Sequence, residues 1–280
     1  MKQRNITLIL GLILTALLLL LLLAGVFYTP HEATAIDPAN RLAPPSFTHL
    51  LGTDHMGRDV FSRVLDGAGT TLFIALATVA IGAFGGALMG AVTGYFGGWL
   101  DEIIMRVADV LTAFPAILLA LVVISLTGPG TGNVIVILGV LFIPSFARVL
   151  RGEFLRCKNL DYVKRARLMG ASAGRIMGVH ILPNTLPVFL SAMAIGFNNA
   201  VLAEASMSFL GLGVQLPDVS LGRLLADSQG YLFHAPWIAL SAGMTIVWMV
   251  LSFSLLADGL QQGERRGHFA FRTGPSRHIS

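Results

Sequence analysis

Long stretches without a charged residue are the feature that most constrains this chain. A helix that crosses about 30 Å of hydrocarbon needs roughly 20 consecutive apolar residues. Charge-free stretches of at least that length lie at residues 5–28, 67–100, 110–147, 176–203 and 228–257. The third is long enough for two helices, and GPGTGN at 128–133 is typical of the turn between them. The sequence therefore predicts an all-α membrane protein with six transmembrane helices.

The first stretch also has features of a secretory signal. Lys2 and Arg4 precede it, and ATA at 33–35 resembles a cleavage site. Its apolar part, 6–27, is however longer than the about 7 to 15 residues of a signal, and the cleavage-like site lies well beyond its end. We therefore expect a retained first helix. Because 55% of the 280 residues are apolar and only 12% are charged, the composition excludes a soluble globular domain.

The distribution of lysine and arginine predicts the orientation of these helices. Residues 148–175 contain eight basic and two acidic side chains, whereas residues 29–69 contain three basic and five acidic ones. Short loops rich in lysine and arginine stay in the cytoplasm, so the first of these segments is predicted inside and the second outside. Six helices then place both termini in the cytoplasm. Anionic lipid head groups suit such a basic inner surface, and no nucleic acid is needed to explain it.

The basic segment 161–187 has the pattern of a docking element. Asp161 can cap a helix over 162–169 that Gly170 ends, and Ser172 can cap a second helix that runs through Arg175 toward Pro183. We expect two short helices on the inner surface.

Glycines recur every four residues in the second predicted helix, at 82, 86, 90 and 94. In lipid, small residues allow the close backbone approach that holds helices together. This stripe predicts tight packing against a helix of the same chain or of a partner subunit, with lining of a substrate path as the minor alternative. Pro115 and Pro144 lie inside the third and fourth spans and are expected to bend them.

Two oppositely charged pairs stand four residues apart in the segment between the first two spans. They are Asp54 with Arg58 and Asp59 with Arg63. On a helix, each pair would meet on one face, so we expect a solvated outer helix lying on the membrane surface. The alternative is a contact with an outer partner or a substrate, and the spacing does not decide between them.

Glu204 lies near the outer end of the fifth span, predicted over 184–210. An ionisable group at membrane depth is costly and usually faces a cavity or a bonded partner. The sequence leaves open a role in the pathway or outer gate and a structural hydrogen-bonding role.

Motifs for catalysis and cofactor binding were not found. The sequence contains no phosphate-binding loop, no HExxH, no paired-cysteine motif and no convincing Ser-His-Asp set. The seven histidines are scattered without metal-ligand spacing. We therefore expect no catalytic residue, no bound cofactor and no metal site.

The segment 161–187 resembles the cytoplasmic EAA loop of bacterial ABC-importer permeases. That loop has the pattern EAA, three residues, Gly, nine residues and I-x-L-P. Here Gly170 is followed by nine residues and then HILP at 180–183, while KRA at 164–166 occupies the EAA positions. In the family this loop forms a coupling helix that docks in a cleft of the ATPase subunit. The resemblance implies an ATPase contact by Asp161, Lys164, Arg165, Ala166, Arg167, Gly170, Ala171 and Pro183.

Two further segments are similar to those of the peptide and nickel importer permeases. GTDHMGRDVFSR at 52–63 resembles their GTDxxGRDxxSR signature, and EASMSFLGLGV at 204–214 resembles their EAxLSFLGLG segment. Met207 replaces the usual leucine, and Leu221 stands where tryptophan often precedes Gly222. The first resemblance implies an outer signature formed by Asp54, Gly57, Arg58, Asp59 and Arg63.

Length and span number resemble the C-type permease subunit of dipeptide, oligopeptide and nickel systems. This resemblance implies the type I ABC importer permease fold, with a cytoplasmic coupling helix and an outer segment between helices 1 and 2. Residues 1–69 would form the first helix and outer segment, 70–260 the permease domain with its coupling loop at about 150–183, and 261–280 a cytoplasmic tail. The chain would be a subunit in a bacterial inner membrane and not an enzyme.

The partners implied by the resemblance are a homologous permease in a heterodimer, two cytoplasmic ATPases and an extracytoplasmic binding protein, within membrane lipid. The cargo would be peptides or a related solute such as nickel or a metal chelate. An ion-gradient-driven secondary transporter is the alternative, but it needs ionisable groups near the midplane or broken helices in matching halves. Glu204 alone, near one edge, supports it weakly. A scaffold or sensor that transports nothing is a third possibility, for which the compact loops leave little room.

Overall fold

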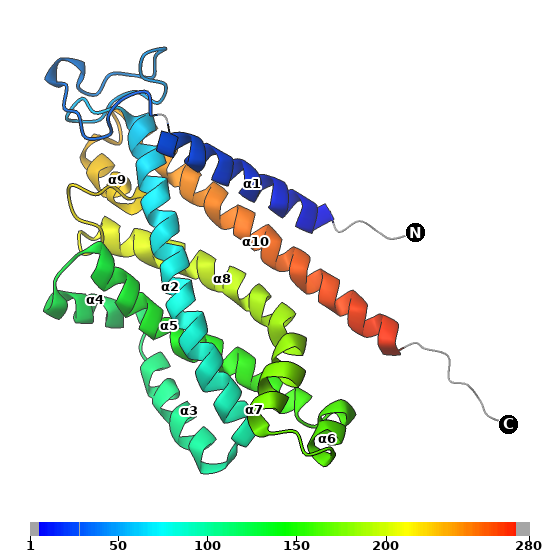
Figure 1. Cartoon of the computed structure of the whole chain (residues 1–280). Coiled ribbons are helices and arrows are strands. Elements are labelled where there is room, and N and C mark those ends of the chain that lie inside the picture. The colour runs from blue at the N-terminus through cyan, green and yellow to red at the C-terminus, as the bar shows by residue number, and fades with distance from the viewer. Residues whose placement is uncertain (1–5, 28, 273–280) are drawn as a thin grey trace.

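The computed structural model describes residues 6–27 and 29–272, and the regular elements of this part of the chain are helices (Figure 1). The α-helices are α1 (Ile6–Phe27), α2 (Val60–Phe96), α3 (Gly98–Thr112), α4 (Ala116–Thr127), α5 (Thr131–Cys157), α6 (Asp161–Leu168), α7 (Ala173–Arg175), α8 (Leu182–Phe209), α9 (Leu221–Ser228) and α10 (Pro236–Arg272). Short 3-10 helices cover Pro38–Asn40 and Gln229–Tyr231, and a π-helix covers Ile176–Ile181.

Five of these helices are long and apolar enough to cross a membrane, namely α1, α2, α5, α8 with the turns before it, and α10. The pair α3 and α4 also qualifies as one span, although its two halves meet at an angle of 85°. Pro115 is the N-cap of α4 at this break, whereas Pro144 lies inside α5 without ending it. The prediction of six spans is therefore confirmed when the broken pair is counted as one.

The glycine stripe of α2 packs against α5 of the same chain. A Cβ added at Gly86 would lie 2.4 Å from Cβ of Phe146, and one added at Gly90 would lie 2.5 Å from the carbonyl oxygen of Ala147. Additions at the other two glycines of the stripe would also meet α5 within 3 Å. Close backbone approach thus joins α2 and α5 into one unit, and of the two partners that the sequence left open, the helix of the same chain is observed.

Helices α1 and α10 lie side by side at one edge of the bundle (Figure 1). Glycines again allow the approach, since a Cβ at Gly11 would lie 2.7 Å from the backbone nitrogen of Leu256. Helix α10 continues to Arg272, so the predicted cytoplasmic tail at 261–280 begins as helix. Lys2, Arg4 and the tail residues 273–280 lie outside the described residues.

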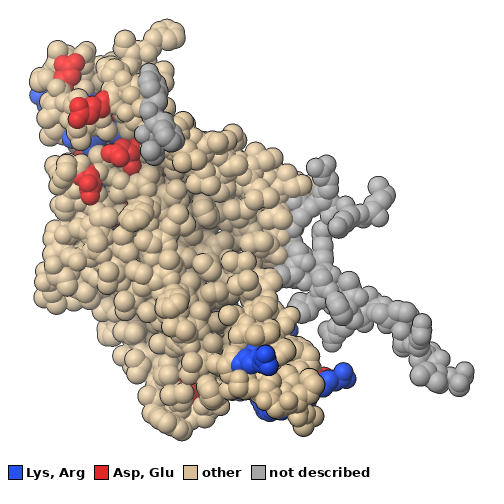
Figure 2. All heavy atoms as spheres, viewed as in Figure 1, with Lys and Arg blue, Asp and Glu red and all other residues tan. Residues whose placement is uncertain are grey.

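Charged side chains gather at two opposite ends of the molecule (Figure 2). Acidic and basic groups cover the end formed by residues 29–59, which we call the outer segment, together with α9. Basic groups mark the other end, around α6. The surface between them in this view is free of charge over its whole width, as a membrane-spanning bundle requires.

Candidate functional site

Helix α6 and the turn after it form the basic end of the molecule. Leu160, not Asp161, is the N-cap of α6, and Asp161 lies in its first turn, where an acidic group suits the helix dipole. Gly170 ends the helix with φ of +80°, as predicted. The amide of Ala171 then donates to the carbonyl of Ala166 at 3.1 Å, which closes the last turn.

The second predicted short helix is not a separate element. Ser172 accepts a hydrogen bond from the amide of Arg175 at 3.4 Å, as expected of its cap. Helix α7 ends at Arg175, however, and the chain continues through the π-helix Ile176–Ile181 directly into α8. Pro183 lies in the first turn of α8, directly after the π-helix, and the chain remains helical through this proline.

One face of α6 is buried and the other is exposed. Val163 and Ala166 pack into the core, so Ala166 supports the helix rather than offering a free surface for the ATPase contact that the resemblance implied. Lys164, Arg165 and Arg167 are exposed, as are Asp161 and Gly170, while Ala171 is half-buried. The exposed face therefore carries most of the predicted docking residues.

Two apolar side chains beside the basic residues complete this exposed surface. Leu168 and Met169 are 88% and 81% exposed at the end of α6. Sequence reasoning missed them, although two large apolar residues next to a helix-ending glycine in a polar segment were a usable signal. Exposed apolar side chains on a polar end typically mark a protein contact. We call Leu168, Met169 and the basic residues 164, 165 and 167 the α6 surface.

Polar contacts fasten α6 and the end of α5 before it to α2 and α8. The Lys158 ammonium donates to the carbonyl of Gly94 on α2 at 2.9 Å, and the Arg167 guanidinium lies 5.9 Å from the ring centroid of Tyr95 on the same helix. Asn184 of α8 donates to the Tyr162 hydroxyl at 3.5 Å, and burial raises the pKa of that hydroxyl. Through α5, which precedes it in the chain, and these contacts with α2 and α8, α6 is held as part of the bundle.

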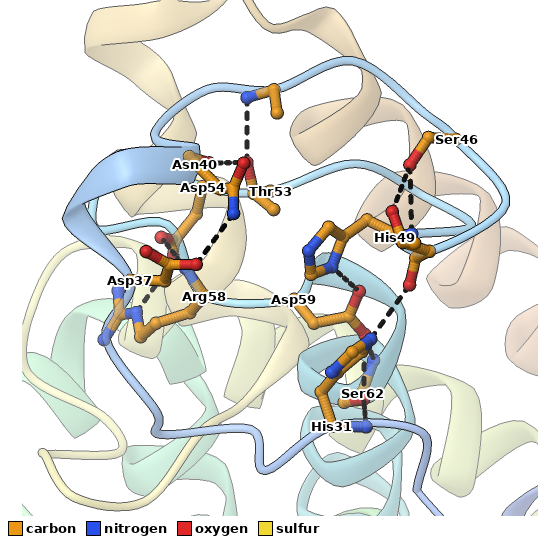
Figure 3. Close-up of polar contacts among 12 residues, drawn as sticks. His31, Asp37, Asn40, Ser46, His49, Thr53, Asp54, Arg58, Asp59 and Ser62 are labelled. Carbon is orange, nitrogen blue, oxygen red and sulfur yellow. Dashed lines mark hydrogen bonds and ion pairs between the residues drawn. The ribbon is translucent and has the colours of Figure 1, made fainter.

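The outer segment folds into a buried ion-pair cluster above α2 (Figure 3). Asp54 pairs with Nε of Arg58 at 2.7 Å and with Nη1 of Arg63 at 3.0 Å. Arg63, which is 1% exposed, also lies 3.5 Å from Asp227 at the end of α9. The cluster therefore fastens the outer segment to α2 and α9.

The prediction of a solvated outer helix was wrong. Asp54 and Arg58 do pair, but in a turn before α2, and the predicted pair of Asp59 with Arg63 does not form. Asp59 instead caps α2 by accepting from the amide of Ser62 at 2.8 Å. Gly57 has φ of +81°, and a Cβ there would lie 1.7 Å from the carbonyl oxygen of Asp37, so the turn requires glycine.

Glu204 is fully buried, and both its carboxylate oxygens are hydrogen-bonded. Thr71 of α2 donates to Oε2 at 3.0 Å, and Ser208 of α8 donates to Oε1 at 2.7 Å. The same hydroxyl of Thr71 accepts from the amide of Leu221, the first residue of α9, at 3.3 Å. The carboxylate thus links α2, α8 and α9 and faces no open path in this conformation.

A cavity of about 570 Å³ lies among α3, α4, α5 and α8. Its wall is largely apolar, with polar groups from Thr112, Ser145 and Asn199. A second hollow of about 200 Å³ shares Ser145 and Asn199 and extends along α5 and α8. Sequence reasoning missed these residues, although two adjacent asparagines inside an apolar span were a signal for a cavity or a partner.

Asn199 differs from its neighbour in its surroundings. Asn198 donates to the Ser254 hydroxyl of α10 at 2.7 Å, whereas Asn199 is exposed on the cavity side of α8. An amide exposed on a spanning helix is poorly suited to lipid, because hydrocarbon offers it no hydrogen bond. This face of α8 is therefore suited to a water-filled space or a second protein.

Known proteins resemble this chain over most of its length. Residues 82–266 match the family described as "Binding-protein-dependent transport system inner membrane component". A dipeptide transport system permease protein DppC of Alkalihalophilus pseudofirmus is 34% identical over 92% of this chain and 85% of its own. A glutathione transport system permease protein GsiD of Pectobacterium atrosepticum is 40% identical over 88% of this chain and 83% of its own.

The fold is also found among solved structures. An inward-facing structure of the MetNI methionine ABC transporter contains a chain that matches with a TM-score of 0.62 at 21% identity. The match covers 72% of this chain and 96% of that one. At this identity the likeness concerns the fold.

Proposed function

Because the chain belongs to the family of binding-protein-dependent transport system inner membrane components, and so is a multi-pass permease of an ATP-driven importer, we propose that its cargo is a short peptide. Relatives of the chain are named for dipeptide, glutathione and peptide transport. The chain is a transport subunit and not an enzyme. The ion-gradient alternative gains no support from the fold or the relatives.

The cavity beside α8 is the observation that carries the cargo proposal. Its volume of about 570 Å³ falls within the range of about 300 to 1,000 Å³ that small-molecule sites occupy. Thr112, Ser145 and Asn199 would supply hydrogen bonds to a peptide backbone, and the apolar wall would accept varied side chains. A homologous permease covering this face, in a heterodimer, would close the cavity into a path between the two subunits.

The α6 surface is proposed to dock on a cytoplasmic ATPase. Leu168 and Met169 would enter an apolar cleft, and Lys164, Arg165 and Arg167 would meet acidic groups around its rim. The EAA pattern has glutamate at the position that Lys164 occupies in this chain. The groove that receives Lys164 is therefore expected to be more acidic than a groove that receives that glutamate. Asp161 and Gly170 would shape the ends of the docked helix.

The opposite end is proposed to receive an extracytoplasmic binding protein. The signature residues Asp54, Arg58 and Arg63 are buried, so they would act by holding the platform of the outer segment and α9 in place. Asp59 and Gly57 would act in the same way, through the cap of α2 and the turn before it. On this proposal both termini are cytoplasmic. The chain then divides into 1–69, a permease domain at 70–260 with its coupling loop at about 150–183, and a tail at 261–280.

Transport of a labelled dipeptide into proteoliposomes that contain the assembled importer tests the cargo proposal. Asn199→Ala should lower uptake by removing a polar group from the cavity wall, while substrate-free ATP hydrolysis stays unchanged. Leu190→Ala is the matched control, because Leu190 is an exposed residue of α8 outside both hollows. Equal uptake by the Asn199→Ala and Leu190→Ala variants would contradict the assignment of this cavity.

Charge reversal tests the docking proposal. The double variant Lys164→Glu and Arg165→Glu should lose both ATPase binding and uptake, because two exposed cations that face acidic groups become anions. Arg106→Glu is the control, since Arg106 is exposed on α3 and lies outside the α6 surface. Wild-type uptake by the double variant would contradict the proposal that the ATPase groove carries acidic groups matched to this surface.

A further inference from the structure

Two histidines and an aspartate from distant positions converge in the outer segment. His31, His49 and Asp59 come together because the segment folds back over the N-terminus of α2 (Figure 3). Spacing in the sequence did not indicate this group, since 18 and 10 residues separate its members. The prediction that the histidines form no metal-ligand set rested on that spacing alone.

The three side chains offer ligand atoms at distances suited to one small ion. One atom from each residue lies within 4.8 Å of the other two. Nδ1 of His49 is 2.9 Å from Oδ1 of Asp59, and the two imidazole rings have centroids 4.7 Å apart. Zinc binds imidazole nitrogen at about 2.0 to 2.1 Å, which places neighbouring tetrahedral ligands about 3.3 Å apart. Small side-chain rotations therefore suffice to bring all three into coordination.

Hydrogen bonds around the group orient its ligands. Oδ2 of Asp59 accepts from the amide and the hydroxyl of Ser62, both at 2.8 Å, which leaves Oδ1 facing His49. Nε2 of His31 lies 2.8 Å from the carbonyl oxygen of Thr48. A carbonyl can only accept, so Nε2 carries the proton and the lone pair lies on Nδ1. The Thr48 carbonyl thus fixes the tautomer and the orientation of the His31 ring, as a second partner commonly does for metal-binding histidines.

We propose that His31, His49 and Asp59 form a binding site for a divalent transition-metal ion, with zinc as the best match to two imidazoles and one carboxylate. The ion takes the place of the proton between Nδ1 of His49 and Asp59, and the neutral imidazole then carries its one proton on Nε2. The His49 side chain is 16% exposed, so the ion can enter from water, and water completes the coordination.

The site is a fastening for the outer segment and not a place for cargo. None of its three residues lines the cavity among α3, α4, α5 and α8. Its ligands come from the chain just after α1, from the middle of the outer segment and from the cap of α2. An ion held there would tie these three parts together and would stabilise the surface proposed to meet the binding protein.

Zinc binding to the purified full-length chain in lipid nanodiscs tests the proposal. After chelation and dialysis, zinc titration against a competing indicator should reveal one tight equivalent in the wild-type chain. His31→Gln and His49→Gln should each weaken that equivalent by about tenfold or more. His234→Gln is the matched control, because His234 is exposed in the loop before α10 and lies outside the group, and this variant should retain the equivalent.

X-ray absorption at the zinc edge of the wild-type protein tests the proposal even if a variant fails to fold. Two imidazoles with oxygen ligands are expected in the first coordination shell. A shell with fewer than two imidazoles would overturn the proposal. So would equal zinc binding by the wild-type, His31→Gln and His49→Gln proteins, which would leave the His49 to Asp59 hydrogen bond as a purely structural contact.

Discussion

Asp54 is the residue on which the buried ion-pair cluster of the outer segment depends. Its Oδ1 accepts from the amides of Met56 and Arg58, at 2.7 and 3.0 Å. Its Oδ2 accepts from the guanidinium groups of Arg58 and Arg63, at 2.7 and 3.0 Å. Asp54→Asn keeps the size and the first oxygen but replaces the second with an NH₂ group. That group is a donor facing two donors, so both charged contacts are lost while both amide contacts remain.

The size of the effect follows from these contacts. A hydrogen bond to a charged group contributes about 1.5 to 3 kcal/mol, and breaking a buried ion pair by removing one partner costs about 3 to 5 kcal/mol. Asp227 remains 3.5 Å from Arg63 and offsets part of the loss. We therefore expect about 3 kcal/mol, which is roughly a hundredfold change in the opening equilibrium of the outer segment.

Hydrogen exchange measures this opening directly. Exchange of the Met56 and Arg58 amides should be roughly a hundredfold faster in the Asp54→Asn variant, because local opening sets their rate. Asp37→Asn is the matched control. Asp37 is exposed, a hydrogen bond from the Asn40 side chain lowers its pKa, and asparagine caps as well as aspartate, so exchange should change about twofold or less.

A double-mutant cycle separates the ion pairs from other effects of the substitution. Adding Arg63→Met to Asp54→Asn removes one of the two guanidinium groups that lose the Asp54 carboxylate. Amide exchange in the double variant should therefore be slower than the two single effects together predict. Equal exchange in the Asp54→Asn and Asp37→Asn variants would refute the reasoning. Strict additivity in the cycle would show that the cation and the carboxylate do not interact.

Three further substitutions test particular contacts. Gly86→Ala should destabilise the protein by about 1 to 3 kcal/mol in thermal unfolding, because the added Cβ meets α5. Gly69→Ala, on the same helix with nothing within 4 Å of the added Cβ, should not destabilise it. Equal unfolding temperatures of the two variants would contradict the close packing. Gly170→Ala, at φ of +80° in open space, should cost about 1 to 2 kcal/mol of α6 stability by hydrogen exchange, and Gly174→Ala, at ordinary φ, should cost less. Glu204→Gln should support uptake at every pH, because hydroxyl groups can turn to bond an amide; loss of uptake in a stable Glu204→Gln protein would instead indicate a pathway role for the charge.

The spans and the glycine stripe were predictable because their causes are local. Hydrocarbon thickness fixes the length of a charge-free stretch, and a four-residue repeat of small side chains fixes one face of a helix. The end of α6 at Gly170 was equally local, since positive φ favours glycine. For the same reason the sequence indicated that α2 packs tightly but not against which helix.

The outer segment was mispredicted because its pairing is not local. The spacing of Asp59 and Arg63 suggested a helical ion pair, but Arg63 pairs with Asp227, 164 residues away. Gly57 and the capping pattern of Asp59 with Ser62 were the available signs that the helix begins only at residue 60. The convergence of His31 on His49 depends on the same fold-back, so spacing could not reveal it.

Helix α2 physically connects the two ends of the molecule. Its 37 residues span about 55 Å, well beyond the hydrocarbon, from the cap at Asp59 to the contacts that Gly94 and Tyr95 make with the α6 region. The glycine stripe holds α5 against α2 over residues 82–94, and close-packed helices move as one body rather than deform. A displacement of α6 by an ATPase would therefore carry α2 and α5 together, along with the outer segment. Because α6 also contacts α8 through Tyr162, and α5 and α8 both line the cavity, such a displacement would act on two walls of the cavity, as alternating access requires.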